Sequence, residues 1–280
     1  MDFRPVIFLS AIVFASSCGQ RQADRFVRID GKDQHILDLG SGEPVVVFVS
    51  GFGSDLGVWS AVQDSVSKFS RTISYDRAGI GKSELTVRDR SLEVLVDELN
   101  SILEQEKIPA PYILVGHSYG GHIIRYFAHI YPDKIAGMVL VDPSVEYMDD
   151  EIRRLKTPAE IKSYDSLREH GRDPSWPEGV KREADYFRTN ELKVKKIRFP
   201  DHAPVTVLTA MPMRESQYSF LKGANDIKLD LHRRWLKDAP HIRHILVQHS
   251  GHFIQFDKPE LVIGEIRRMA RKIKDGPGIR

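Results

Sequence analysis

The chain has 280 residues, of which 41% are hydrophobic, and its 41 basic and 39 acidic residues leave a net charge of only +2. This length fits one large α/β domain or two small domains, and the hydrophobic content is enough for a sizeable core. The near balance of charge argues against a nucleic-acid-binding protein, which would carry a basic excess or a basic stripe.

The first residues have the layout of an export signal. One basic residue precedes an apolar run over residues 5–15, and small residues follow. This pattern is typical of a secretory signal peptide, and the run is too short for a permanent membrane-spanning helix. The stretch ASSC, which ends at Cys18, resembles the lipobox of bacterial lipoproteins. We therefore expect residues 1–17 to be a signal peptide, residues 18–25 to be a polar tether, and a lipidated Cys18 to anchor a secreted protein to a membrane of the cell envelope. An ordinary secretory signal with an incidental cysteine is the alternative.

Strand patterns and helical patterns alternate through the rest of the chain. Two short strands, joined by the turn sequence GKD, are predicted at residues 25–30 and 34–40. Continuous apolar runs, which suit strands buried on both faces of a parallel sheet, cover residues 44–50, 70–76, 111–116, 135–142, 204–210 and 243–249. Most of them are separated by helical patterns, at residues 56–69, 91–105, 120–131, 227–237 and 259–274. This alternation predicts an α/β fold: a mostly parallel sheet with helices on both faces, and an antiparallel edge made by the first hairpin.

One segment departs from the alternation. Residues 143–203 contain no convincing strand, but they carry dispersed charges and several aromatic residues. We expect a small helical cap inserted between two strands of a core formed by residues 26–142 and 204–280. A long disordered loop is the alternative, and the aromatic content argues against it.

A serine lies between two glycines in the stretch ILVGHSYGGHIIRYF. A predicted strand ends at Gly116 and a helical pattern starts near Tyr119, so Ser118 falls on the turn between them. Glycines two residues before and after the serine let strand and helix approach closely, which is the mechanical basis of the G-x-S-x-G nucleophile elbow. The turn lifts the hydroxyl above a helix N-terminus, where negative charge is favoured. We therefore expect Ser118 to be a nucleophile rather than only a helix cap.

With this motif in place, the chain resembles the α/β-hydrolases of the lipase, esterase and haloperoxidase type. The resemblance runs from about Phe26 to Ile273 and rests on four blocks in order: VVFVSGFGSDLGVW, SYDRAGIGKS, LVGHSYGGH and HSGHFIQFDKPELV. It implies an α/β-hydrolase fold, with a mostly parallel eight-stranded sheet flanked by helices. The first block departs from the family pattern, because Ser50 stands where a histidine usually precedes the glycine.

The resemblance also implies roles for further residues. His252, in the GH pair of the fourth block, stands where the family has its catalytic histidine, and a serine nucleophile needs such a base. The family's oxyanion donors correspond to the backbone N–H groups of Phe52 and Tyr119. For His117 and His122, which flank the nucleophile, we expect roles in packing or at the rim of the site.

The acid that would orient the histidine has more than one candidate. Many members of the family place it after the strand that follows the insertion, where the first acid here is Glu215. Some members place it at the end of the preceding strand, where this chain has Asp142. We favour Asp142, keep Glu215 as the alternative, and rank Asp226 third.

These observations predict a serine hydrolase that cleaves a carboxylic ester or a related acyl bond of a small molecule through an acyl-enzyme. The chain has no histidine and carboxylate spacing like H-E-x-x-H, so we expect no catalytic metal and no cofactor. Two alternatives stay open: a catalytically silent binding protein on the same scaffold, and a cofactor-free haloperoxidase or perhydrolase activity.

Overall fold

The computed structural model describes residues 22–170, 173–213, 223–239 and 241–275. Their strands form one sheet in the order β1-β2-β4-β3-β5-β6-β7-β8. The strands are β1 (Gln22–Ile29), β2 (Lys32–Leu39), β3 (Val45–Val49), β4 (Thr72–Tyr75), β5 (Tyr112–His117), β6 (Ile135–Val141), β7 (Val205–Met211) and β8 (Arg243–Gln248). The helices are α1 (Ser60–Ser67), α2 (Leu92–Gln105), α3 (Gly120–Ile130), α4 (Met148–Leu155), α5 (Pro158–His170), α6 (Glu178–Val194), α7 (Ala224–Asp238), α8 (Ile254–Asp257) and α9 (Pro259–Asp275).

Strand direction confirms the predicted α/β-hydrolase sheet. β1 pairs antiparallel with β2, and β2 pairs antiparallel with β4. All the remaining pairs are parallel. The turn between β1 and β2 places Asp30 and Gly31 at φ of 49° and 75°, a backbone conformation that suits a two-residue hairpin.

The predicted tether is wrong for residues 22–25, because β1 begins at Gln22. Side chains of this stretch make specific contacts that hold it on the sheet. Arg25 forms ion pairs with Asp38 and Glu106. Asp24 lies 2.6 Å from the Nε2 atom of the buried His35. The predicted signal peptide and Cys18 lie outside the described residues, so the lipid anchor stays a prediction.

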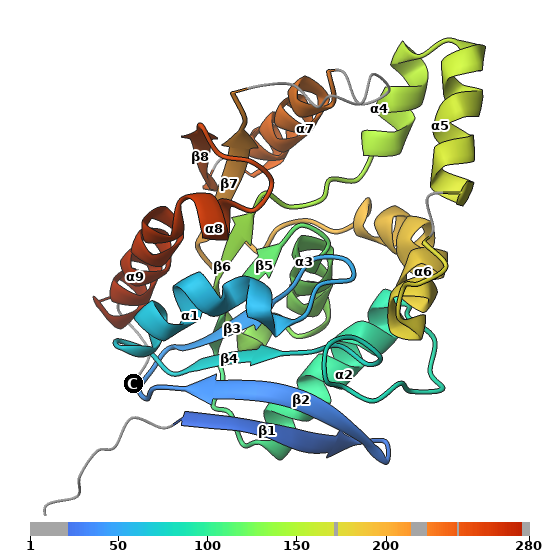
Figure 1. The fold of residues 1–280 in the computed structure, drawn as a ribbon. Helices are drawn as coiled ribbons and strands as arrows, with labels where there is room; N and C mark the ends of the chain where they lie inside the picture. The colour runs from blue at the N-terminus through green and yellow to red at the C-terminus, as the bar shows by residue number, and fades with distance from the viewer. Residues whose placement is uncertain (1–21, 171–172, 214–222, 240, 276–280) are drawn as a thin grey trace, which may run out of the picture.

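Two apolar layers cover the two faces of the sheet (Figure 1). One contains side chains of α2, α3 and α7, such as Leu95, Ile123 and Trp235. The other contains side chains of α1 and α9, such as Val62 and Ile266. None of the described helices is long and apolar enough to cross a membrane.

The described residues between β6 and β7 form α4, α5 and α6 and contain no strand. Figure 1 shows the three helices together along one side of the molecule, beyond the end of the sheet. Their helical character matches the insertion that the sequence predicts. Because β3, β5, β6, β7 and β8 are parallel, their carboxyl ends meet at one edge, where ligands usually bind in such sheets.

Candidate active site

Ser118 occupies a strained turn at the end of β5. Its φ is 51°, in the left-handed region that non-glycine residues seldom adopt. The backbone N–H of Ser118 donates to the carbonyl oxygen of Val141 at 3.1 Å, and its carbonyl oxygen accepts from Gly121 at 2.9 Å. The side chain is partly exposed. The turn therefore presents the hydroxyl at the surface, directly before α3.

The two flanking glycines are required by close packing. A Cβ atom at Gly120 would lie 2.2 Å from the carbonyl oxygen of Val49, and one at Gly116 would lie 2.7 Å from the carbonyl oxygen of Gly120. Neither position has room for a side chain. This explains physically why the sequence has glycine two residues before and two residues after Ser118.

The structure brings Asp142 and His252 together across 110 positions of sequence. The Nδ1 atom of His252 lies 2.7 Å from Oδ2 of Asp142. Asp142 follows β6 and is fully buried, whereas the His252 side chain is 48% exposed. The carboxylate can therefore fix one imidazole nitrogen while the other side of the ring stays open to a substrate.

Two further donors hold the carboxylate of Asp142. The backbone N–H of Ala210, in β7, donates to Oδ1 at 2.9 Å. The ammonium group of Lys228, in α7, donates to Oδ2 at 2.8 Å. Burial alone would raise the pKa of Asp142, but the hydrogen bond from His252 and the charge of Lys228 outweigh it and lower this pKa to about 2. Asp142 is thus ionised at neutral pH.

Ser118 is not hydrogen-bonded to His252 in the described structure. The hydrogen bond recorded for its Oγ atom is with the Oγ atom of Ser144, at 3.4 Å. The N–H of Ser144 also donates to the carbonyl oxygen of Ser118 at 3.0 Å. Catalytic hydrogen bonds often shorten only when a substrate binds.

His117 supports the loop that carries His252. Its Nε2–H donates to the carbonyl oxygen of His252 at 3.0 Å, and the two ring centroids are 4.6 Å apart. Burial, helped by the nearby His252, lowers the pKa of His117 to about 4. His122 is also buried, and neither of its ring nitrogens has a partner among the described residues. Both side chains therefore pack, as predicted.

The two residues that would donate to an oxyanion lie in one aromatic cluster. The ring of Phe52 contacts those of Tyr119, Trp176 and Phe187, with centroids 6.5, 5.7 and 5.8 Å apart. Phe187 belongs to α6 and stacks on Tyr119 at 5.1 Å. The cap therefore packs directly on the two predicted oxyanion residues.

Arg77 and Glu183 tie α6 to the predicted oxyanion loop. The guanidinium of Arg77 donates to the carbonyl oxygens of Ser50 and Gly51 at 2.8 and 2.7 Å, and it pairs with Glu183. Glu183, in α6, also accepts from the N–H of Gly53 at 3.3 Å. Both charged side chains are buried. Ser50, the departure from the family pattern, supports the same loop by donating its hydroxyl to the carbonyl oxygen of Asp55 at 2.9 Å.

Asn190 makes a second link from α6. Its side-chain amide donates to the carbonyl oxygen of Arg90 at 2.8 Å and to the hydroxyl of Tyr119 at 2.7 Å. Its oxygen accepts from the N–H of Leu92, at the start of α2, at 2.9 Å. Asn190 is fully buried. Helix α6 is therefore bonded to the core beside both predicted oxyanion residues.

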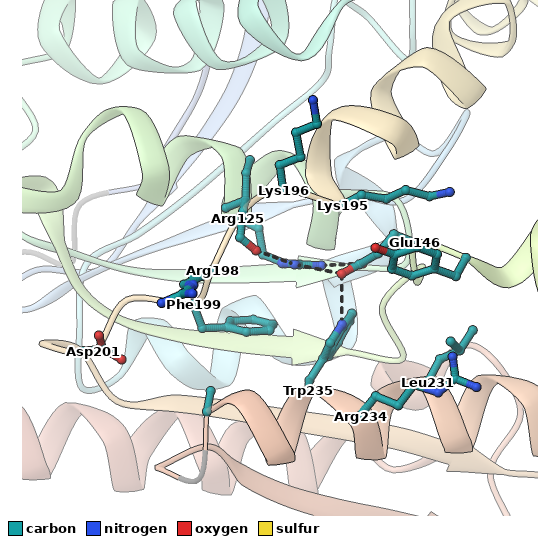
Figure 2. A pocket seen from close by; sticks show the side chains of 13 residues that line it. Arg125, Glu146, Lys195, Lys196, Arg198, Phe199, Asp201, Leu231, Arg234 and Trp235 are labelled. Carbon is teal, nitrogen blue, oxygen red and sulfur yellow. Dashed lines mark hydrogen bonds and ion pairs between the residues drawn. The ribbon is translucent and has the colours of Figure 1, made fainter.

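A cavity of about 590 Å³ lies beside α3 and α7, and none of the three residues predicted for catalysis lines it. Figure 2 shows Glu146 between Arg125 and Trp235. Glu146 accepts from Arg125 at 2.7 and 3.1 Å and from the indole N–H of Trp235 at 3.0 Å. The guanidinium of Arg125 lies over the rings of Phe199 and Trp235. These contacts connect α3, the segment after Asp142, and α7.

The other predicted acids have different outcomes. Glu215 lies outside the described residues. Asp226 is exposed in the first turn of α7. Among the described residues, no group of three or more histidine, cysteine or acidic side chains is arranged to hold a metal ion.

Sequence reasoning missed several residues of the site. Lys228 belongs to a charge-rich helix, where no spacing distinguishes it from its neighbours. Glu183 and Asn190 lie in the cap, 106 and 71 positions from Arg77 and Tyr119. The one available signal for Arg77 was its place in the block SYDRAGIGKS.

Comparison with known proteins identifies relatives. The sequence pattern of the alpha/beta hydrolase fold family matches residues 44–187. An "AB hydrolase superfamily protein" of Gibberella zeae is 23% identical over 284 residues, which cover 83% of this chain and 88% of that protein. The human "(Lyso)-N-acylphosphatidylethanolamine lipase" is 35% identical over 101 residues, which cover 35% of this chain and 30% of the lipase. The chain spans less than half the length of the first curated relatives it matches, between 22% and 42%.

Solved structures show the same architecture. Cfl2 from Burkholderia cenocepacia superposes with a TM-score of 0.62 at 19% sequence identity, over 89% of this chain and 95% of that one. The matched sequence pattern covers just over half of the chain and includes the elbow serine, and the sheet has the order described above. The chain therefore belongs to the α/β hydrolase fold family.

Proposed function

We propose that this hydrolase cleaves a carboxylic ester or a related acyl bond, with Ser118 as nucleophile, His252 as base and Asp142 as the acid that orients the base. The observation that carries the proposal is the 2.7 Å contact between His252 and the buried Asp142, on loops at the same sheet edge as the elbow. These residues occur in the chain order serine, acid, histidine that is usual for this fold.

The proposed reaction has two halves. Ser118 Oγ attacks the carbonyl carbon while the Nε2 atom of His252 takes the hydroxyl proton. The tetrahedral oxyanion is held by the backbone N–H groups of Phe52 and Tyr119, and His252 returns the proton to the leaving alcohol. Water then attacks the acyl-enzyme while His252 takes its proton. His252 returns that proton to Ser118 Oγ, and the carboxylic acid is released. Each oxyanion donor contributes about 3 kcal/mol to transition-state stabilisation in a comparable serine hydrolase.

The surroundings of the proposed oxyanion loop favour an apolar group on the substrate. Phe52, Phe187 and Trp176 are each only partly buried, and the ring of Phe52 contacts the other two rings next to that loop. Aromatic side chains of this kind suit an acyl chain or a hydrophobic alcohol. One curated relative carries the name lipase, which is compatible with an ester substrate.

The proposal predicts that Ser118→Ala abolishes hydrolysis of p-nitrophenyl acetate and labelling by a fluorophosphonate probe. Removing the nucleophile of a comparable triad lowers kcat by about 10⁶-fold. Both assays use purified protein, and circular dichroism checks that the variant is folded.

Ser144→Ala is the matched control, because Ser144 is the neighbouring hydroxyl at 3.4 Å. It should still react with the probe. Labelling that survives in Ser118→Ala, or that disappears only in Ser144→Ala, would refute the nucleophile assignment. If the probe labels no residue of the folded wild-type protein, the proposal of an activated serine fails, and the catalytically silent binding protein becomes the favoured alternative.

A further inference from the structure

One face of α7 contacts the segment that carries the proposed acid. Lys228 contacts Asp142 at 2.8 Å. One turn later, His232 donates its Nε2–H to the carbonyl oxygen of Pro143 at 3.2 Å. Its Nδ1 atom is free to accept from the hydroxyl of Thr209, at 2.6 Å. Trp235, nearly one more turn along, donates to Glu146 (Figure 2).

Three of these contacts are with the loop after β6, and they fix the place of Lys228. Positions four and three residues apart lie on one side of an α-helix, and here they meet consecutive parts of the loop after β6. The Lys228 side chain is only 15% exposed. Its ammonium group is therefore held at the acid rather than sampling solvent.

Lys228 and His252 share a single oxygen atom. Both donate to Oδ2 of Asp142, at 2.8 and 2.7 Å. The ammonium nitrogen can be at most about 5.5 Å from the imidazole nitrogen, which is the combined length of the two hydrogen bonds. At such a distance a cation opposes any positive charge that the imidazole gains.

Among the described residues, two buried histidines lie near the pair, and neither is positively charged at neutral pH. His117, from β5, and His232, from α7, are both neutral there because burial lowers their pKa values to about 4 and about 3. On the loop of His252, the carboxylate of Asp257 accepts from the N–H of Gly251 at 2.7 Å. Among the described residues, Lys228 is thus the one cation bonded to the acid.

We propose that Lys228 is a positioning residue of this active site: it fixes the carboxylate of Asp142 and opposes the positive charge that His252 acquires during the reaction. The proposal rests on the function proposed above. Sharing Asp142 with a lysine keeps the buried carboxylate compensated while His252 is neutral, and weakens its pull on the imidazole proton.

The test compares Lys228→Met, which removes the charge at similar length, with Lys228→Arg, which keeps it. In Lys228→Met, the acidic limb of the kcat/KM profile for p-nitrophenyl acetate should move to higher pH by about one unit. In Lys228→Arg, the limb should stay at its wild-type position. Lys237→Met is the matched control, because Lys237 is exposed on the same helix, and it should leave the profile unchanged.

A second readout needs no turnover. The proton on Nδ1 of His252 should give a downfield ¹H NMR signal, and Lys228→Met should move that signal further downfield because Oδ2 no longer accepts from two donors. The proposal would be overturned if a folded Lys228→Met variant kept both the acidic limb of the kcat/KM profile and the downfield NMR signal at their wild-type positions. This holds even if its activity falls equally at every pH. If wild-type protein neither turns over ester nor reacts with the fluorophosphonate, the proposed function fails, but the NMR comparison still decides the role of Lys228.

Discussion

Asp142 concentrates the electrostatics of the site at one residue. It has a φ of 40° and no exposed surface, and its carboxylate accepts from β7, from α7 and from the loop that follows β8. A buried carboxylate is tolerated when its oxygens are satisfied in this way. The backbone strain at Ser118 and at Asp142 lies on the two turns from which the proposed chemistry starts.

Replacing this acid should separate the two leading sequence candidates. Asp142→Asn should lower kcat/KM about 10⁴-fold, because an amide no longer holds the reactive tautomer of the imidazole. Ester hydrolysis by the purified variants measures the effect. Glu215→Gln and Asp226→Asn should keep wild-type turnover, and a loss confined to Glu215→Gln would show that Glu215 is the acid.

The lowered pKa of Asp142 also predicts a dependence of stability on pH. The folded-state pKa, about 2, lies below the ordinary value of 3.8. The unfolded chain therefore binds the proton first as the pH falls. Asp142 should contribute roughly 2 kcal/mol of stability above about pH 4, lost as the pH falls towards 2. Urea unfolding measures the free energy of unfolding of the wild-type protein and of Asp142→Asn at pH 5 and pH 3. The difference in this free energy between the two proteins should be smaller at pH 3 than at pH 5. A constant difference would contradict the assignment.

At the scale of elements, α6 behaves as part of the core rather than as a loose lid. Two buried side chains of this helix bond to residues at the predicted oxyanion site. Glu183 accepts from the N–H of Gly53, next to Phe52, and Asn190 donates to the hydroxyl of Tyr119. At its first turn, a Cβ atom on Gly179 would lie 2.5 Å from the backbone of Gly79. The helix and the SYDRAGIGKS loop are therefore in direct backbone contact.

Asn190→Ala should lower the free energy of unfolding by about 2 kcal/mol, since it leaves buried polar groups at Leu92, Arg90 and Tyr119 without partners. It should also slow ester hydrolysis, because Tyr119 carries a proposed oxyanion donor. Thr189→Ala is the control on the same helix, where the side chain is exposed. Equal unfolding free energies for the two variants would show that the network does not stabilise the cap.

Elements that depend on local pattern were predictable, and elements that depend on distant partners were not. The parallel strands are continuous apolar runs, and the elbow has its glycines at fixed spacing, so Ser118 could be placed from sequence. The resemblance to the family pointed to Asp142 and His252, on loops that follow strand ends. The pairing of Arg77 with Glu183 and the reach of Lys228 depend on how the cap and α7 fold over the sheet, which no periodicity encodes.

At the scale of the whole molecule, buried histidines should make folding sensitive to acid. Burial lowers the pKa values of His117 and His122 to about 4 and that of His232 to about 3. The unfolded chain therefore takes up these protons first. Stability should be fully present above about pH 6.5 and fall towards pH 4, by up to about 4 kcal/mol per pH unit where all three contribute. Urea unfolding between pH 7 and pH 4.5 measures this slope.

His122→Leu should reduce that slope by about a third, because one of the three protons is no longer taken up. It should leave stability at pH 7 no lower than in the wild-type protein, since both ring nitrogens lack a partner among the described residues. His129→Gln, on the exposed side of α3, is the control. A slope unchanged in His122→Leu would mean that this ring is not buried in the neutral form.

The bonding of α6 restricts how such a protein can be recombined with its relatives. A chimera that exchanged residues 143–203 for the cap of another hydrolase would remove Glu183 and leave the buried guanidinium of Arg77 without its ion-pair partner. Transplants should succeed only when the donor segment brings an acid and an amide to the places of Glu183 and Asn190. In this molecule, exchanging the cap therefore also requires redesign of the core residues that are bonded to α6.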